Sequence, residues 1–205
     1  MANDPEYDRW NARFAQPDYV FGTAPNAFLA AQRARLKPGQ KALALADGEG
    51  RNGVWLAQQG LDVLSVDFSP AGQEKARRLA QKCGVALRTE LADLTRRNWE
   101  SEAFDVVAAI MIQFAGPPER ESIFRGMKRA LKRGGLVILQ GYRPEQIAYK
   151  TGGPPTAENM YTEELLRREF GDMRILHLKA HDDTIAEGAG HHGLSALIDM
   201  VAEKM

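Results

Sequence analysis

A glycine-rich turn near residue 50 constrains the fold of this chain more than any other feature. Residues 47–53 read DGEGRNG; they follow the apolar run KALALA at 41–46 and precede the helix-forming stretch VWLA at 54–57. Glycines let a backbone turn sharply and approach a ligand closely, and the free N–H groups at a helix start favour a phosphate or a carboxylate. The pattern predicts a strand, a turn and a helix of a nucleotide-binding unit.

Two acids in the following segments point to an adenosine ligand. Residues 61–67 read LDVLSVD, which predicts a buried strand ending at Asp67, where a carboxylate would bind ribose hydroxyls. The next apolar segment, at 85–87, precedes LADL at 91–94. Asp93 is placed to accept a hydrogen bond from the adenine amino group, while Leu94 and Phe68 would cover the ring faces.

Alternating apolar and amphipathic segments predict an α/β fold. Strand-length apolar runs lie at 42–46, 63–66, 85–87, 106–112 and 136–139, with helical patterns between them. Such alternation predicts a parallel sheet. Prolines and glycines mark the expected helix boundaries, with starts at Ser69-Pro70 and Pro117-Pro118 and ends at Gly84 and Gly134-Gly135.

The end of the chain breaks this alternation. A helix is expected from about Thr162, and strand candidates at 173–179 and 194–202 follow without a helical pattern between them. Adjacent strands without a crossover helix predict an antiparallel pair. The expected fold is therefore α/β, Rossmann-like and doubly wound, with a mostly parallel seven-stranded sheet and an antiparallel C-terminal strand.

Composition limits the domain count and the partners. A chain of 205 residues, 44% of them hydrophobic, suits one domain; we expect N-terminal helices that act as a lid at 1–36 and the Rossmann-like core at 41–205. Lys+Arg and Asp+Glu each total 27, so the zero net charge disfavours nucleic acid or an anionic membrane as partner. One cysteine, a polar start and no run near the ~18 apolar residues of a membrane span predict a cytoplasmic protein, monomeric or homodimeric.

At nine short segments the chain resembles the class I S-adenosylmethionine-dependent methyltransferases, and it is most similar to their small tellurite-resistance-type branch. The segments are 10–14, 19–26, 47–53, 66–67, 92–94, 104–107, 131–135, 151–154 and 187–191. The resemblance implies S-adenosylmethionine as cofactor and a small-molecule methyl acceptor. It also implies cofactor contacts from three groups of residues: Trp10, Arg13, Tyr19 and Asn26 in the lid; Asp47, Gly48, Glu49, Gly50 and Asn52 in the turn; and Asp67, Phe68, Ala92, Asp93, Leu94 and Gln113 beyond it.

One departure from the family pattern concerns the methionine end of the cofactor. The family has an acid two residues before the first glycine of the turn, whereas this chain has Ala44 and Ala46 there. Asp47 or Glu49 would then bind the methionine ammonium, because carboxylates pair readily with ammonium groups. Alternatively, both are solvated loop acids that favour the helix start. The lid aromatics likewise either contact the cofactor or dock the N-terminal helices on the core.

Methyl transfer from a sulfonium is an in-line displacement that needs alignment and exclusion of water, so a catalytic base is optional. If the acceptor must lose a proton, His191 is the leading candidate, followed by His192, His181 and Tyr161. The alternative for His191 is a structural histidine in a Gly-rich turn. His181 with Asp182-Asp183 lacks a second ligand set, so a turn rather than a metal site is expected there.

Two other functions compete with this interpretation. An NAD-dependent oxidoreductase would explain Asp67 and the literal match of residues 48–53 to G-x-G-x-x-G, but it leaves Asp93 and the antiparallel end without a role. The chain also lacks a Tyr-x-x-x-Lys pair. A non-catalytic S-adenosylmethionine-binding protein is suggested by the missing acid at Ala44.

Overall fold

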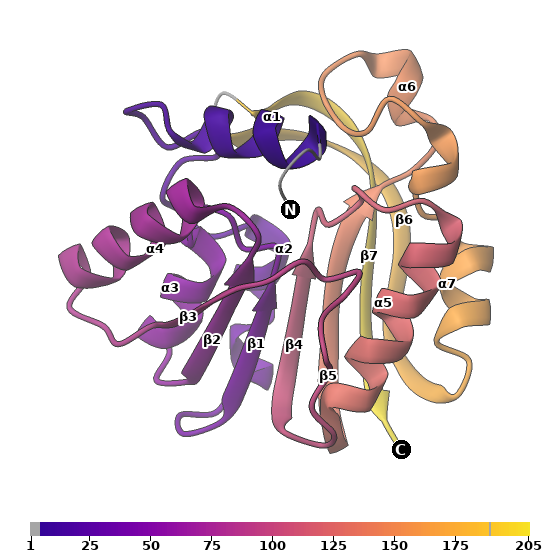
Figure 1. Cartoon of the computed structure of the whole chain (residues 1–205). Coiled ribbons are helices and arrows are strands. Elements are labelled where there is room, and N and C mark those ends of the chain that lie inside the picture. The colour runs from indigo at the N-terminus through magenta and orange to yellow at the C-terminus, as the bar shows by residue number, and fades with distance from the viewer. Residues whose placement is uncertain (1–4, 189) are drawn as a thin grey trace.

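The computed structural model describes residues 5–188 and 190–205 and contains a central seven-stranded sheet with helices on both faces (Figure 1). The strand order is β3-β2-β1-β4-β5-β7-β6. The strands are β1 (Lys41–Leu45), β2 (Asp62–Asp67), β3 (Arg88–Leu91), β4 (Phe104–Ile110), β5 (Leu131–Tyr142), β6 (Met173–Glu187) and β7 (His191–Lys204). The helices are α1 (Pro5–Phe14), α2 (Ala27–Ala31), α3 (Arg51–Gln58), α4 (Pro70–Lys82), α5 (Pro117–Ala130), α6 (Gln146–Tyr149) and α7 (Glu163–Glu169), with short 3-10 turns η1 (Arg33–Arg35) and η2 (Ala157–Asn159).

The strand order reverses beside β1, which fixes where a ligand can bind. The chain builds β1, β2 and β3 outward in one direction, then returns to place β4 on the other side of β1 and continues to β5, all in parallel. In such sheets the crevice forms outside the carboxyl ends of the strands at this switch point. β7 inserts antiparallel between β5 and β6, so the expected antiparallel end is confirmed.

The two faces of the sheet follow from strict alternation along β1. Leu43 and Leu45 belong to a buried cluster that includes α5 and α7 residues, among them Phe124 and Leu166. Ala42 and Ala44 point to the opposite face, where the cluster includes Leu29 and Leu56 of α2 and α3. Successive strand side chains point to opposite faces, so one apolar run serves both layers.

Three expected helix starts are confirmed, two of them by side-chain caps. The hydroxyl of Ser69 accepts a hydrogen bond from the backbone N–H of Gly72 at the start of α4, with Pro70 in the first turn. Pro117 opens α5, and the hydroxyl of Thr162 accepts from the N–H of Leu165 at the start of α7. These side chains satisfy N–H groups that have no partner inside the helix.

Two expected boundaries are wrong. The third strand runs over Arg88–Leu91, whereas Val85 and Leu87 pack against the cluster of Val54 and Leu79. An edge strand is half exposed and needs no apolar run, so the hydrophobic signal belongs to the segment before it. Likewise α5 ends at Ala130, and Gly134-Gly135 lie inside β5 where its register with β4 shifts. Glycines in a strand mark such bulges.

The hairpin is longer than expected, and this corrects the interpretation of residues 181–183. These residues lie within β6, paired with Leu197 to Ser195 of β7, and do not form a turn. The imidazole Nε2 of His181 lies 2.8 Å from Asp199 Oδ2, which accounts for a histidine and acids in a strand. An edge strand tolerates polar side chains because one side of it faces solvent.

The N-terminal segment crosses the sheet at the end where the parallel strands finish. Figure 1 shows α1 lying over the carboxyl ends of β1, β2 and β4, with the segment around α6 beside it. The helices of the described residues are short, and even α5 has only 14 residues. In the part of the chain that the structure describes, no helix has the length and apolar character needed to cross a membrane.

Candidate functional site

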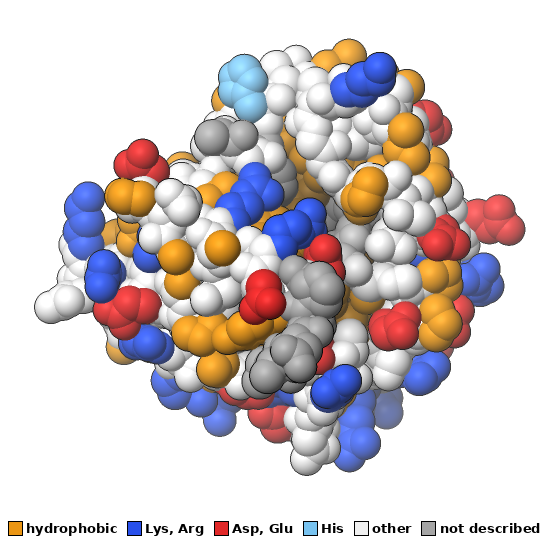
Figure 2. Space-filling model, turned by 45° about the horizontal axis from the view of Figure 1, so that its top comes forward, with side chains coloured by type: hydrophobic (Ala, Val, Ile, Leu, Met, Phe, Trp, Pro, Cys, Tyr) orange, Lys and Arg blue, Asp and Glu red, His pale blue; other side chains and the backbone are white. Residues whose placement is uncertain are grey.

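A cavity of about 460 Å³ lies at the switch point, enclosed by α1, the glycine turn, the strand ends and the loop after α6. Figure 2 shows the molecule from the side on which this end is hollowed, with Lys and Arg side chains beside the hollow. Of the predicted site residues, the cavity brings together Trp10, Arg13, Asp47, Gly48, Asn52, Asp67, Phe68 and Gln113. Tyr19, Asn26, Glu49, Gly50, Ala92, Asp93, Leu94 and Tyr161 are not among its lining residues.

Asp67 joins the two loops that border the cavity on the β1–β2 side. Its Oδ2 accepts a hydrogen bond from the Gly48 N–H at 2.9 Å, and its Oδ1 accepts from the Ser69 N–H at 2.8 Å. Burial raises the pKa of Asp67 to about 6, although these backbone donors act in the opposite direction. A carboxylate with spare lone pairs at a cavity wall suits a ligand that brings hydroxyl donors.

The Asp47 carboxylate holds the glycine turn in place by hydrogen bonds, and Asp47 also lines the cavity. Its Oδ2 accepts from the Ser65 hydroxyl at 2.7 Å, and its Oδ1 accepts from the Gly53 N–H at 3.1 Å. Burial raises the pKa of Asp47 to about 7, and the nearby charge of Asp67 acts in the same direction. The carboxylate therefore holds the first turn of α3 on the end of β2, whatever else it binds.

The glycine turn brings its backbone close to α1 and α4. Gly48 and Gly50 adopt positive φ values of 55° and 86°, and Ala46 adopts 44°. A Cβ on Gly48 would lie 2.9 Å from the ring of Phe14, and one on Gly50 would lie 2.5 Å from Ala76. Gly50 therefore permits α3 and α4 to pack closely, while Gly48 leaves its backbone open to the cavity.

Two aromatic rings and an arginine close the cavity from the N-terminal side. The Arg13 guanidinium lies 5.0 Å from the ring of Trp10 and 5.2 Å from that of Phe21. Cation–π contact holds such a guanidinium over the ring faces. The pKa of Arg13 is lowered, first by burial and then by the charge of Arg9.

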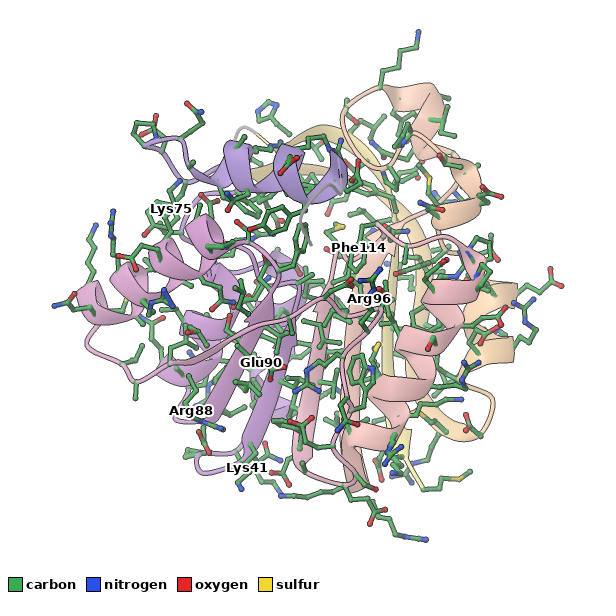
Figure 3. All side chains as sticks on the ribbon, in the orientation of Figure 1. Lys41, Lys75, Arg88, Glu90, Arg96 and Phe114 are labelled. Atoms are coloured by element: carbon green, nitrogen blue, oxygen red, sulfur yellow. The ribbon has the colours of Figure 1, made fainter. Side chains whose placement is uncertain are left out.

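Glu49 and Tyr19 tie the N-terminal segment to α4 and do not line the cavity. The Glu49 carboxylate is buried, with Oε1 2.7 Å from Lys75 Nζ and Oε2 accepting from the Val20 N–H at 2.8 Å. The Tyr19 hydroxyl donates to the Lys75 carbonyl at 3.1 Å. Lys75 lies midway along α4 (Figure 3). This arrangement leaves Glu49 little freedom to bind a ligand ammonium.

Asn26 is a buried junction between the lid and the far half of the sheet. Its side-chain oxygen caps α2 by accepting from the Leu29 N–H at 3.0 Å. Its amide nitrogen donates to Gln140 Oε1 at 2.6 Å and to Glu187 Oε1 at 2.8 Å. Its backbone N–H donates to the Asn52 side chain at 2.9 Å, which fixes the start of α3 beside the lid.

Of the predicted adenine contacts, some line the cavity and others do not. Phe68 lines it, whereas Leu94 is buried in the core cluster beside α5. The Asp93 carboxylate accepts hydrogen bonds from the backbone and the hydroxyl of Thr95, at 2.9 and 2.7 Å. Asp93 thus shapes the loop after β3, and its role toward adenine stays a prediction.

The candidates for proton transfer are spread over the β5–β7–β6 half. Tyr161 is fully buried against Phe124, away from the cavity, and burial raises the pKa of its phenol. His191 opens β7 and follows Gly190, which lines the cavity, but the His191 side chain lies outside the described residues. Gln113 lines the cavity and donates to the Tyr142 carbonyl at 2.8 Å, so its amide braces the end of β5.

Several lining residues were not predicted from the sequence. They include Glu6, Arg9, Phe21, Arg51, Met111, Phe114, Tyr142 and the loop at 152–156. Phe114 appears above the end of β4 in Figure 3. The sequence could have pointed to Arg51, because a cation in the first turn of a helix interacts unfavourably with the helix dipole unless an acid lies nearby. That acid is Glu187, 2.6 Å away. Among the described residues, no cluster of three or more His, Cys, Asp or Glu side chains could hold a metal ion.

A family model described as "Methyltransferase domain" matches residues 42–135. An uncharacterised methyltransferase of Synechocystis is 34% identical over 106 residues, covering 51% of this chain and 48% of that protein. A glycine/sarcosine N-methyltransferase of Aphanothece halophytica is 28% identical over 158 residues, covering 68% of this chain and 59% of that protein. The matched part of the chain thus spans about half of the Synechocystis protein's length and less than two thirds of the other's.

Solved structures share the whole fold. TehB from Haemophilus influenzae superposes with a TM-score of 0.72 at 18% identity, covering 98% of this chain and 67% of that one. The N-methyltransferase NodS from Bradyrhizobium japonicum gives 0.67 at 11% identity and covers 98% of each chain. At these identities the likeness speaks for the fold alone. The family match covers the glycine turn and strands β1 to β4, so this part of the chain is similar to a methyltransferase domain, and the solved structures show that the whole chain has the same fold.

Proposed function

We propose that this chain transfers a methyl group from S-adenosylmethionine to a small-molecule acceptor. The observation that carries the proposal is the cavity at the switch point, which joins the predicted ribose acid Asp67 to a separate wall made by α1 and the loop at 152–156. One end of such a cavity suits the cofactor, and the other suits a second small molecule. A volume of about 460 Å³ leaves room for a small acceptor only.

The walls around Asp67 fit the nucleoside end of the cofactor. Asp67 keeps lone pairs available beside its two backbone donors, and a ribose diol would supply the hydroxyl donors that a buried carboxylate requires. Phe68 follows directly and offers a ring face to adenine. In this proposal Asp93 and Leu94 approach the base from the loop after β3, with Ala92 beside them.

The glycine turn and the lid would hold the amino-acid end. Gly48 and the edge of Asp47 line the cavity where the methionine ammonium would sit, and Asn52 and Gln113 line the same space. Bound S-adenosylmethionine supplies an electrophilic methyl group on a sulfonium, and an acceptor nucleophile displaces it in line. Trp10 and Arg13 would cover the reacting groups and exclude water. Tyr19, Asn26 and Glu49 act in this proposal by holding the lid in place, and Gly50 by fixing the turn.

A base belongs to the proposal only for acceptors that carry a proton. His191 is the residue we assign to that role, because Gly190 beside it lines the cavity. Tyr161 stays a second candidate, although its buried phenol would need a rearrangement to reach the acceptor. We also propose that the protein works in the cytoplasm as a monomer or homodimer; its zero net charge favours a small molecule over nucleic acid.

Release of S-adenosylhomocysteine from a panel of small acceptors tests the proposal directly. We expect turnover with at least one acceptor class, such as amines, thiols or oxyanions. Binding of S-adenosylhomocysteine without turnover of any acceptor would favour the alternative, a non-catalytic cofactor-binding protein. The variant Arg133→Gln, at the opposite end of the sheet, controls for general damage.

A further inference from the structure

Two arginines at the acceptor end of the cavity have bonding capacity that the described protein does not use. Arg51 lines the cavity and is almost fully buried; its Nη2 lies 2.6 Å from Glu187 Oε2, but its buried Nη1 has no hydrogen-bond partner. Buried guanidinium N–H groups are costly to leave unpaired, so this atom indicates a missing acceptor.

Arg13 supplies a second cation on the same cavity, at its exposed edge. Its guanidinium lies beside the rings of Trp10 and Phe21, and it has no hydrogen bond or ion pair with any residue in the described ranges 5–188 and 190–205. The neighbouring cation Arg9 is different, because it is paired with Glu6 at 2.6 Å. Stacking fixes the guanidinium plane and leaves its N–H fork free for a planar or tetrahedral anion.

The position of these cations separates them from the nucleoside end. Arg51 is paired with Glu187 at the end of β6, and its charge influences the phenol of Tyr142 on β5. Arg13 lies beside the turn between β6 and β7, where a Cβ on Gly190 would come 3.0 Å from its Nη2. Asp67 ends β2, on the other side of β1 in the strand order. Both cations therefore lie away from the nucleoside end, on the side of the cavity that the proposed function gives to the methionine end of the cofactor and to the acceptor.

From these observations we infer that the methyl acceptor carries an anionic oxygen group, such as a carboxylate or a phosphate, bound by Arg51 Nη1 and the Arg13 guanidinium. The inference rests on the proposed function and adds the substrate class. Glu187 orients Arg51 for this contact, and the rings of Trp10 and Phe21 hold the Arg13 guanidinium at the cavity edge. The buried guanidinium of Arg51 discriminates strongly for an acid over its neutral amide.

The methionine carboxylate of the cofactor is the other possible source of the anion, and a binding experiment separates the two. Inorganic phosphate and acetate serve as probes, titrated by calorimetry into protein saturated with S-adenosylhomocysteine. The variants are Arg51→Lys, Arg13→Gln and Arg13→Lys, with Arg133→Gln as the matched control. Arg13 is exposed enough at the cavity edge that its variants are expected to fold, which thermal unfolding checks.

We expect at least one probe to bind the cofactor-loaded wild type, and Arg13→Gln and Arg51→Lys to weaken it about 10- to 100-fold, as for a lost charge-assisted hydrogen bond. Arg13→Lys should lose less than Arg13→Gln, and Arg133→Gln should match the wild type. No binding of either probe, or binding indifferent to both arginines, overturns the inference. Weaker S-adenosylhomocysteine binding with unchanged probe affinity assigns the arginines to the cofactor and overturns it too. Failure of the wild type to bind S-adenosylhomocysteine counts against the proposed function instead.

Discussion

At the scale of single residues, Asp67 is the most consequential prediction from the sequence. Its position after a buried apolar strand predicted an acid at the cavity, and the structure places it there with two backbone donors. The aspartate carboxylate should bind the ribose diol, so Asp67→Ala is expected to weaken S-adenosylhomocysteine binding by about 1.5–3 kcal/mol, the range for hydrogen bonds to a charged group. Calorimetry measures this, with circular dichroism to verify the fold. An unchanged dissociation constant in a folded variant rejects the assignment.

The pair Asp47 and Asp67 also predicts how stability depends on pH. Burial raises their pKa values to about 7 and about 6, above the unfolded value of about 3.9. The folded protein therefore binds more protons than the unfolded chain between about pH 4 and pH 7, and its free energy of unfolding falls as the pH rises through this window.

Asp47→Asn should flatten that fall, because asparagine does not ionise and can still accept from the Gly53 N–H. Urea unfolding at pH 5 and pH 7.5 measures it in protein without cofactor. The exposed Asp183, changed to Asn, is the matched control and should keep the wild-type slope. If Asp47→Asn loses stability as steeply as the wild type, the buried carboxylate is not the source of the pH dependence.

His191 carries the prediction on chemistry at this scale. If it acts as a base, His191→Ala should lower turnover about 10²- to 10⁴-fold with acceptors that carry a proton and little with acceptors already ionised. The adjacent and exposed His192, changed to Ala, is the control. Steady-state rates with both acceptor types in each variant separate a base from a structural histidine, which would affect both types alike or neither.

At the scale of elements, the lid is held by defined contacts rather than by aromatic packing alone. Val20 donates to Glu49, Glu49 pairs with Lys75, and Asn26 reaches β5 and β6. We expect hydrogen exchange over residues 19–26 to slow when S-adenosylhomocysteine binds, because the cavity then gains a ligand beneath the lid. Glu49→Gln should speed exchange at Val20 in the free protein. Exchange that is indifferent to both the ligand and this variant contradicts a lid.

The elements also show what the sequence could and could not predict. Apolar runs of strand length and the caps at Ser69 and Thr162 are local signals, so strands β1, β2 and β4 and the starts of α4 and α7 were recognised. The edge strand β3 and the polar part of β6 were missed, because edge strands do not need an apolar pattern. The bulge at Gly134-Gly135 depends on the register with β4, which is a tertiary property.

For the same reason, the sequence did not point to cavity residues whose contacts come from distant elements. Asp67, Gly48 and Phe68 lie directly after strands, and the topology alone brings them to the cavity. Arg51 and Glu187 are 136 positions apart, and only the insertion of β7 beside β5 brings them together. The ion pair of Glu49 could not be predicted either, because its partner Lys75 lies on α4, 26 positions further along the chain.

At the scale of the whole molecule, a ligand bound only by the folded state must raise stability. S-adenosylhomocysteine at a hundred times its dissociation constant should add about 2.7 kcal/mol, which corresponds to about 5–10 °C in Tm for a chain of this size. Differential scanning calorimetry at two ligand concentrations checks both the shift and its logarithmic dependence on concentration. A Tm that does not move at saturation contradicts specific binding to the folded protein.

The central claim is that the cavity at the switch point holds S-adenosylmethionine rather than a dinucleotide, even though residues 48–53 match the dinucleotide pattern. Calorimetric titration of the same protein with S-adenosylhomocysteine and with NAD tests it most directly. We expect saturable binding of S-adenosylhomocysteine and binding of NAD at least tenfold weaker, a difference of about 1.4 kcal/mol. NAD binding that is equal or tighter would contradict it.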